Sequence, residues 1–591
     1  MQTNPFEFEA ALRFTPAEMV DYFIDNNNFA RFINSQRNVF LLGDRGTGKT
    51  MMLRYYSLPV QAWKNARDSE SAASRPELQH LGIYIPCRNP AVTKREPELM
   101  EARQNALLMS EHFLVTAVIY AIAESLASVG NLLSSSEERI VRDEIKYLFQ
   151  WEIADTLPLF EALRSAATRE SVAIQRELNR RFLDVYYENA VTFSNAIIPF
   201  LDLVTNNVDR LRNAHFSLMF DDADALSNLQ NEILNSWIAS RNSPKISFKV
   251  ATSLVDQKPL TTAGGGSLLE RHDFIRVDME ADFQSSDTTF HKLATDIVER
   301  RLEKAGLLGV SASAFFPINT AMQHDLDAAE AKTRTIAGTV YADGTEKQIR
   351  DYVYKYKRAY YFRDRSPKAN RPPYSGFDLI VHVSTGVLRY LLEPCYEMYD
   401  AAQSRLPKDN VQVAVIPPSI QTEILADLSK RRWAWIREGF NNSVRGCNRS
   451  DSIRIANLVE NFALLLTHRL HHHRSEPRAI TFFVSAKESF ERTQELLDLL
   501  EIARRAQILF KRPGSGKDFG KREDYYIFDR LLWIDRGLDP VGQNASISIE
   551  ARSLWEAAFE NRAFPGAVFE KSKRKRKDAA QVELFDPEVY E

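Results

Sequence analysis

Val39-Phe40-Leu41-Leu42 runs directly into Gly43-Asp44-Arg45-Gly46-Thr47-Gly48-Lys49-Thr50, and these twelve residues are the most informative about the fold. The four apolar residues are too few for a helix and end at a glycine-rich turn, which predicts a buried parallel strand. The eight residues that follow fit G-x-x-x-x-G-K-[ST] at every fixed position. Because Met51-Met52-Leu53-Arg54-Tyr55 then begins a helical pattern, the context favours a phosphate-binding loop over a chance glycine turn.

Each part of this loop has an expected role in binding ATP. Small residues let backbone N–H groups wrap the phosphates, and the start of the helix directs positive charge at them. We expect Lys49 to reach the β- and γ-phosphates and the Thr50 hydroxyl to bind Mg²⁺. The remaining nucleotide-binding residues are expected to be Gly43, Asp44, Arg45, Gly46, Thr47 and Gly48.

A second motif is Phe216-Ser217-Leu218-Met219-Phe220-Asp221-Asp222, an apolar strand that ends in acids. Such a segment is typical of a Walker B motif, in which Asp221 would bind the magnesium ion. Asp222 would orient or deprotonate the attacking water. The alternative is that these acids, together with Asp224, cap the next helix.

Further apolar runs resemble the first strand, and helical patterns separate them. This alternation predicts a parallel sheet covered on both faces by helices. The gap at 88–214 is too long for one crossover and reads as a helical insertion. Near the N-terminus, Thr15, Pro16 and Glu18 predict one capped helix over 15–34. The expected strands are 39–42, 81–85, 216–220, 246–251 and 274–277.

Composition restricts the class of protein. The chain has 591 residues, of which 44% are hydrophobic and 26% charged, and its net charge of -3 excludes a polycation. The three cysteines fit a reducing compartment and offer no zinc spacing. No run approaches about 18 apolar residues and the N-terminus lacks the basic residues of a secretory leader, so we expect a cytoplasmic protein with no membrane contact.

With these motifs in this order, the sequence resembles the AAA+ ATPases, and within them the origin-recognition and replication-initiator branch. The resemblance covers about 10–300 and 375–400 and implies an α/β AAA+ core with a helical lid. It also implies a γ-phosphate sensor at Thr252, an arginine finger at Arg271 that acts on a neighbouring subunit, and a lid sensor at Arg389. A finger of this kind predicts a homo-oligomer. Arg271 is otherwise a surface ion-pair residue, and Gly386-Val387-Leu388-Arg389 otherwise a helix start.

One position departs from the family. Most active AAA+ enzymes have glutamate where this chain has Asp222, whose carboxylate lies about one methylene further back. Catalytic geometry tolerates little displacement, so we expect hydrolysis to be slow. Slow hydrolysis suits a timed switch better than a motor.

The C-terminal region from 480 has the element order of a winged helix, including a basic loop at 511–522 that would follow a phosphate backbone. The alternative is a solvated hairpin that docks on protein. We expect Arg504 on the preceding helix to add to this basic face. The expected DNA-binding residues are Arg505, Lys511, Arg512, Lys517, Lys521 and Arg522.

The last residues contain two short signals. Six of the seven residues 571–577 are Lys or Arg. Gln581, Leu584 and Phe585 form Gln-x-x-Leu-Phe, which resembles the peptide that docks on bacterial DNA sliding clamps. The alternative is a chance amphipathic end.

The sequence therefore predicts a core at 1–280, a lid at 281–405 interrupted by a polar insertion at 321–375, a helical connector at 406–479, a winged helix at 480–560 and a basic tail at 561–591. We expect an ATPase that couples nucleotide state to DNA or to a partner protein. The alternative is a nucleotide-dependent switch of bacterial antiviral defence that activates a separate effector protein.

Overall fold

The computed structural model describes residues 4–7, 10–25, 29–68, 77–180, 189–240, 243–280, 287–365, 372–406, 412–472, 476–485, 489–513, 524–542 and 545–565. The chain forms two compact units. One is Glu9–Glu280, and the other joins Met1–Phe8 to Ala281–Glu591. The finer divisions expected from the sequence stay predictions.

A parallel five-stranded sheet organises the first unit, in the order β2-β3-β4-β1-β5. Each of the five expected strands is present within a residue or two of its expected bounds. The sheet is consistent with an AAA+ core. The strands are β1 Val39–Leu42, β2 His80–Pro86, β3 His215–Asp221, β4 Ile246–Thr252 and β5 Ile275–Asp278.

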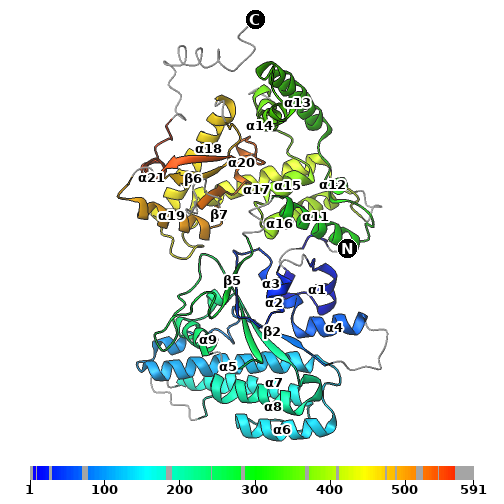
Figure 1. Cartoon of the computed structure of the whole chain (residues 1–591), viewed down its shortest axis with the longest axis vertical. Helices are drawn as coiled ribbons and strands as arrows, with labels where there is room; N and C mark the ends of the chain where they lie inside the picture. The colour runs from blue at the N-terminus through cyan, green and yellow to red at the C-terminus, as the bar shows by residue number, and fades with distance from the viewer. Residues whose placement is uncertain are drawn as a thin grey trace. The chain divides into compact units, whose positions relative to one another are not determined.

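Helices surround this sheet (Figure 1). The longest, α5, packs on β2 and on α7, and its buried side chains form one core with those of the sheet. The region expected to be a helical insertion contains α5 to α8. The helices are α1 Pro16–Tyr22, α2 Ala30–Ile33, α3 Lys49–Tyr55, α4 Leu58–Asp68, α5 Arg103–Ala127, α6 Ser135–Phe149, α7 Leu159–Arg180, α8 Ile198–Asn207 and α9 Asn228–Ser240, with short turns η1 Ala10–Leu12, η2 Glu96–Leu99, η3 Phe193–Ile197, η4 Asp209–Leu211 and η5 Ala223–Ala225.

Two expectations about helices in this unit need correction. Thr15 and Glu18 form the expected capping box, but the helix ends at Tyr22, because Phe23 adopts an extended conformation. The expected helix at 15–34 is therefore two shorter ones. In addition, α5 is long and apolar enough to span a membrane, which the sequence reading missed, but 72% of its most apolar window is buried inside the protein.

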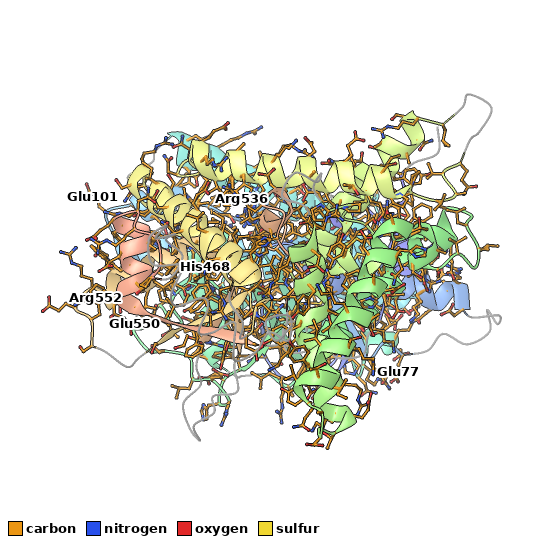
Figure 2. All side chains as sticks on the ribbon, turned by 90° about the horizontal axis from the view of Figure 1, so that it is seen from above. Glu77, Glu101, His468, Arg536, Glu550 and Arg552 are labelled. Carbon is orange, nitrogen blue, oxygen red and sulfur yellow. The ribbon has the colours of Figure 1, made fainter. Side chains whose placement is uncertain are left out.

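The second unit is mainly helical and includes a second sheet of four strands, in the order β7-β8-β6-β9. β6 pairs antiparallel with β8 and parallel with β9. Glu550 and Arg552 lie exposed where β9 meets α21 (Figure 2). The elements are α11 Asp287–Lys304, α12 Ala312–Phe315, α13 Thr320–Val340, α14 Glu346–Asp364, α15 Phe377–Val383, α16 Leu388–Ser404, α17 Pro418–Glu438, α18 Arg449–His472, β6 Thr481–Ser485, α19 Thr493–Arg505, β7 Leu509–Pro513, β8 Asp524–Phe528, α20 Leu532–Asp535, β9 Ser546–Glu550 and α21 Ala551–Phe559.

The polar stretch at 321–375 was expected to interrupt the helical pattern, and most of it is instead the helical hairpin α13–α14. Asn319 and Thr345 cap the two helices through side-chain hydrogen bonds. The helices pack on each other, so few apolar positions are enough to hold them, and the sequence shows only a weak apolar stripe.

The N-terminal segment belongs to the second unit. Phe6 is fully buried against the rings of Phe315, Phe316 and Tyr399, with centroids 5.7–6.1 Å apart. Arg301 donates hydrogen bonds to the carbonyls of Pro5 at 2.7 Å and Glu7 at 2.9 Å. The chain thus begins in one unit, forms the other and returns.

Candidate nucleotide site

The glycine-rich loop joins β1 to α3, as the sequence predicted. Gly46 and Gly48 have φ angles of 91° and 96°, in the left-handed region that favours glycine. A Cβ at Gly43 would lie 2.8 Å from the Thr47 hydroxyl oxygen. The hydroxyl of Thr47 donates to the Asp44 carbonyl at 2.9 Å. Gly46 and Gly48 are therefore favoured by their backbone conformation, and Gly43 by the lack of room for a Cβ.

Lys49 lies inside the turn of this loop. Its Nζ donates hydrogen bonds to the carbonyls of Gly43 at 2.6 Å and Asp44 at 3.0 Å, and the residue is only 6% exposed. Arg45, by contrast, is exposed. The loop backbone thus holds a buried ammonium group at its centre, which is the charge that a phosphate requires.

The two sequence motifs meet at Asp221. Its Oδ2 accepts a hydrogen bond from the Thr50 hydroxyl at 2.7 Å and another from the Tyr84 hydroxyl at 2.8 Å. Burial, followed by the neighbouring Asp222, raises the pKa of the Asp221 carboxyl. A cation would stabilise its ionised form. Oxygen donors from Thr50 and Asp221 fit Mg²⁺, which usually takes one or two protein ligands and completes its shell with phosphate and water.

Asp222 follows in a left-handed conformation, with φ 52° and ψ 46°. Its Oδ2 lies 2.9 Å from Nε of Arg88, and the same guanidinium bonds Asp224 at 2.9 Å. Arg88 comes two residues after β2, so the carboxyl ends of neighbouring strands bring these groups together. The carboxylate assigned to water activation is therefore held in an ion pair.

Two more strand ends contribute to this edge of the sheet. Thr252 is the last residue of β4, is 3% exposed, and accepts a backbone hydrogen bond from Gly43 at 3.3 Å. Ser253 donates to Asp44 Oδ1 at 3.3 Å. Glu280, just beyond β5, accepts a hydrogen bond from the Asp44 amide. Burial, and next the Asp44 carboxyl, raise the pKa of Glu280 to about 7.

Sequence reasoning missed Tyr84, Arg88 and Glu280. The signal for each was its place at the carboxyl end of an expected strand, where parallel strands gather side chains at one edge. None of the three belongs to a short motif, so the order of the strands in the sheet is needed to show that they lie beside the two motifs.

The remaining residues predicted for catalysis lie apart from this cluster or in the other unit. Arg271 is exposed in the turn before β5, has a φ of 70°, and makes no side-chain hydrogen bond or ion pair within the described ranges. Arg389 is exposed in the first turn of α16 and contributes to a cavity of about 360 Å³ together with Tyr390, Arg432 and Trp435. Within the described part of the first unit, no hydrogen bond or ion pair joins Arg271 to Lys49.

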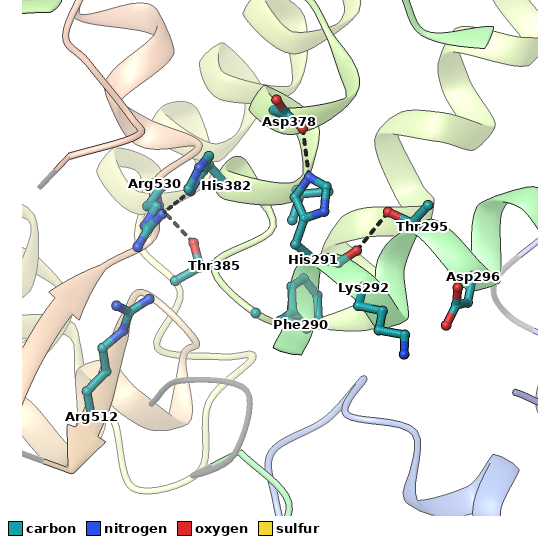
Figure 3. A pocket seen from close by; sticks show the side chains of 12 residues that line it. Phe290, His291, Lys292, Thr295, Asp296, Asp378, His382, Thr385, Arg512 and Arg530 are labelled. Carbon is teal, nitrogen blue, oxygen red and sulfur yellow. Dashed lines mark hydrogen bonds and ion pairs between the residues drawn. The ribbon is translucent and has the colours of Figure 1, made fainter. Parts of the chain in front are cut away.

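The predicted DNA-binding residues are only partly described. Arg505 is exposed at the end of α19, and Lys511 forms an ion pair with Asp524 at 2.8 Å. Arg512 is half-buried at a cavity (Figure 3). Arg504 does not add to a basic face as expected, because it is 6% exposed and bonds Glu501 at 2.8 Å. The predicted residues outside the described part are Lys517, Lys521, Arg522, Gln581, Leu584 and Phe585.

Comparison with known proteins gives one result. A family model described as ORC-CDC6-like matches residues 4–340 and 324–549, which together span both units. No curated protein matches the chain at the significance required.

Proposed function

The chain belongs to the ORC-CDC6-like family of AAA+ ATPases, and we propose that it is a cytoplasmic switch that binds ATP with Mg²⁺ and hydrolyses it. The observation that carries this proposal is the meeting of Lys49, Thr50 and Asp221 at one edge of the sheet. Lys49 would exchange its carbonyl partners for the β- and γ-phosphates. Thr50 and Asp221 would hold the Mg²⁺, which neutralises charge on the phosphates.

The other site residues act on water and on the γ-phosphate. Asp222 orients the attacking water, and Thr252 contacts the γ-phosphate from the end of β4. Arg389 supplies a positive charge from the lid, which couples the nucleotide state to the lid. Because Asp222 is shorter than glutamate and is paired with Arg88, turnover is slow.

The test is the Lys49→Ala variant, with Lys146→Ala as its matched control. Lys146 is on α6 and forms a surface ion pair with Asp155. Lys49→Ala should abolish ATP binding and turnover, whereas Lys146→Ala should leave both unchanged. Undiminished ATPase activity of Lys49→Ala would refute the site.

We place Arg271 at the active site of a neighbouring subunit, which makes the protein a homo-oligomer. Its side chain is exposed and makes no hydrogen bond or ion pair with the part of the chain that the structure describes, which supports this role. An arginine finger contributes about 10³–10⁵ in rate. Arg271→Ala and Lys49→Ala should each be inactive alone, and mixing them should restore part of the activity because some interfaces regain both groups. A mixture without any activity would count against a shared site.

We propose duplex DNA as the partner of the C-terminal sheet, through Arg505, Lys511, Arg512, Lys517, Lys521 and Arg522. The support among the described residues is Arg505, which is exposed at the end of α19, the helix that packs on β7. Changing Lys517, Lys521 and Arg522 to glutamate should weaken duplex binding and reduce its salt dependence by about 0.9 per lost phosphate contact. The control changes Lys146, Arg212 and Lys304 in the same way. Equal losses in both variants would argue against this surface.

A protein partner is a second candidate, and α6 favours it. Tyr147 is 81% exposed and Ile140 is 48% exposed, and their spacing of seven residues puts them on one face of the helix. In this reading the nucleotide state activates a separate effector of an antiviral system. Genes for an effector enzyme beside this one, and ATP-dependent activation lost on Ile140→Asp plus Tyr147→Asp, would support it. Activation that survives both changes would exclude this face.

The tail gives a third interaction to test, with a DNA sliding clamp. Leu584→Ala plus Phe585→Ala should abolish clamp binding, because two side-chain pockets would lose their occupants. Val582→Ala plus Glu583→Ala, at the unconstrained positions of the pattern, is the matched control. A clamp pull-down that the first variant leaves unchanged would remove this proposal.

A further inference from the structure

Tyr84 lies beside Asp221 because of the register between β2 and β3. In this parallel pair Pro86 is opposite Asp221, and Tyr84 is opposite Met219. Side chains that are paired across two strands, or two residues apart along one strand, lie on the same face of a sheet. Tyr84 and Asp221 are therefore on one face, which α3 covers. The long phenol side chain reaches the end of β3, where its hydroxyl lies 2.8 Å from Oδ2 of Asp221.

Three donors hold the Asp221 carboxylate. Oδ2 accepts the hydroxyls of Thr50 at 2.7 Å and Tyr84 at 2.8 Å, and Oδ1 accepts the backbone N–H of Asp222 at 3.1 Å. These donors come from α3, from β2 and from the turn after β3. An aspartate carboxylate has only a broad preference for rotation about its last bond. With partners on both oxygens, the carboxylate of Asp221 is held in one orientation.

The two acids at the end of β3 have partners of different charge. Arg88 pairs with Asp222 at 2.9 Å and brings a positive charge to it. Tyr84 is a neutral donor, because a free phenol has a pKa of about 10, and burial, followed by the Asp221 carboxylate, raises the pKa of Tyr84 further. Its hydroxyl therefore orients Asp221 without neutralising it. The negative charge of Asp221 stays available to a cation.

Tyr84 differs from the other two donors in having no part of its own in the proposed reaction. Thr50 is a proposed ligand of Mg²⁺, and Asp222 is proposed to orient water. Tyr84 contacts the carboxylate of a metal ligand instead. Residues that orient metal ligands in this way typically change metal affinity by about 10–100-fold when they are removed.

We propose that Tyr84 is a positioning residue for Mg²⁺, whose hydroxyl holds the Asp221 carboxylate in the orientation that receives the metal ion when ATP binds. This inference rests on the proposed ATPase function and adds a residue to that site. Because Tyr84 acts through Asp221, removing its hydroxyl weakens the binding of Mg²⁺. The contacts that Lys49 and the glycine-rich loop make with the phosphates do not depend on it.

The experiment compares the wild type with full-length Tyr84→Phe, which lacks only the hydroxyl. ATPγS, a slowly hydrolysed analogue of ATP, is first titrated into each protein in EDTA. Mg²⁺ is then titrated by calorimetry into protein in molar excess over ATPγS, so that all the nucleotide is bound before metal is added. The dissociation constant of ATPγS should be unchanged, and that of Mg²⁺ should rise by about 10–100-fold.

Further variants separate positioning from a structural role. Tyr120→Phe removes a hydroxyl that donates to Glu124 at 3.4 Å on α5, and should bind Mg²⁺ like the wild type. Tyr84→Phe added to Asp221→Asn should weaken Mg²⁺ binding no further than Asp221→Asn alone, because the hydroxyl acts through that carboxylate. The melting temperature of Tyr84→Phe without nucleotide should fall by at most about 4 °C, the effect of one lost hydrogen bond in a unit of this size.

Three results would overturn the proposal. Equal affinities of Tyr84→Phe and wild type for Mg²⁺, in proteins that bind ATPγS, would remove the role of Tyr84 and leave the ATPase site standing. Equal losses of affinity for ATPγS in EDTA and for Mg²⁺ would show that the hydroxyl supports the fold of the whole site. A wild-type protein that binds no ATPγS would refute the nucleotide site itself, and the role of Tyr84 with it.

Discussion

The hydroxyl oxygen of Thr50 lies 2.7 Å from Oδ2 of Asp221, so a single hydrogen bond joins the first residues of α3 to the end of β3. The glycine-rich loop and the acidic end of β3, which are far apart in the sequence, are thus in direct contact. β4 lies between their strands in the sheet, and the loop and the acid both project from the same edge. This contact brings together Thr50 and Asp221, the two residues that we propose as Mg²⁺ ligands.

Asp221→Asn should weaken Mg²⁺ binding without lowering the stability of the fold. The amide can still accept hydrogen bonds from Thr50 and Tyr84, but it loses the charge that holds Mg²⁺. A bound metal ion is worth several kcal/mol of transition-state stabilisation, so kcat should fall by at least about 100-fold. The melting temperature without nucleotide should be equal or higher, because a buried charge is removed. A large loss of melting temperature would indicate a structural role instead.

Arg88→Gln should raise the rate of ATP hydrolysis a few fold. The change removes the cation that pairs with Asp222 and leaves that carboxylate free to orient water. Steady-state kcat with saturating Mg-ATP is the measurement. Arg103→Gln, which removes a surface pair with Glu232 on the same unit, is the control. An Arg88→Gln enzyme slower than wild type would mean that the ion pair is the active arrangement.

Lys249 should make stability depend on pH above neutrality. The residue is fully buried in β4, where its Nζ donates to the Ser35 carbonyl at 2.6 Å, and burial lowers its pKa from 10.5 to about 7. Between pH 7 and about 10 the unfolded chain binds the extra proton, so the free energy of unfolding should rise with pH in this window. Lys249→Met should flatten the rise and Lys146→Met should not. Identical pH profiles for all three proteins would show that Lys249 stays charged.

Asp539→Asn should strongly destabilise the second unit. Arg358 bonds both carboxylate oxygens of Asp539 at 2.7–3.1 Å, and Arg478 bonds it at 3.2 Å. These cations lower the pKa of the buried Asp539 carboxyl to about 2 against the cost of burial. Its loss would leave two arginines without their shared anion, at a cost of about 3–5 kcal/mol in the free energy of unfolding.

The control for this prediction is Asp427→Asn, which removes an exposed ion pair with Arg431. Exposed pairs contribute about 0–1 kcal/mol, so denaturant unfolding should barely change. If the two variants lose similar stability, the buried network contributes no more than a surface pair.

Local sequence was enough to predict the elements that depend on near neighbours. The five strands of the first sheet are apolar runs that end at turns, and the Thr15–Glu18 capping box is a contact over three residues. The loop at 43–50 is fixed by its glycines. The expected helix at 15–34 and the interruption at 321–375 were wrong because helix ends and weak apolar stripes depend on what packs against them. The same holds for Arg504, which the sequence predicted to be exposed.

The phosphate loop, the acidic strand end and the alternating order of strands and helices could all be predicted from the order of the amino acids. The positions of Tyr84, Arg88 and Glu280 around those motifs, the burial of Lys249 in the sheet and the packing of Phe6 in the second unit become evident only in the folded chain. The physical reason is that these contacts join segments that are distant along the chain. Their partners are selected by strand order and by burial, and neither leaves a pattern in the residues on either side.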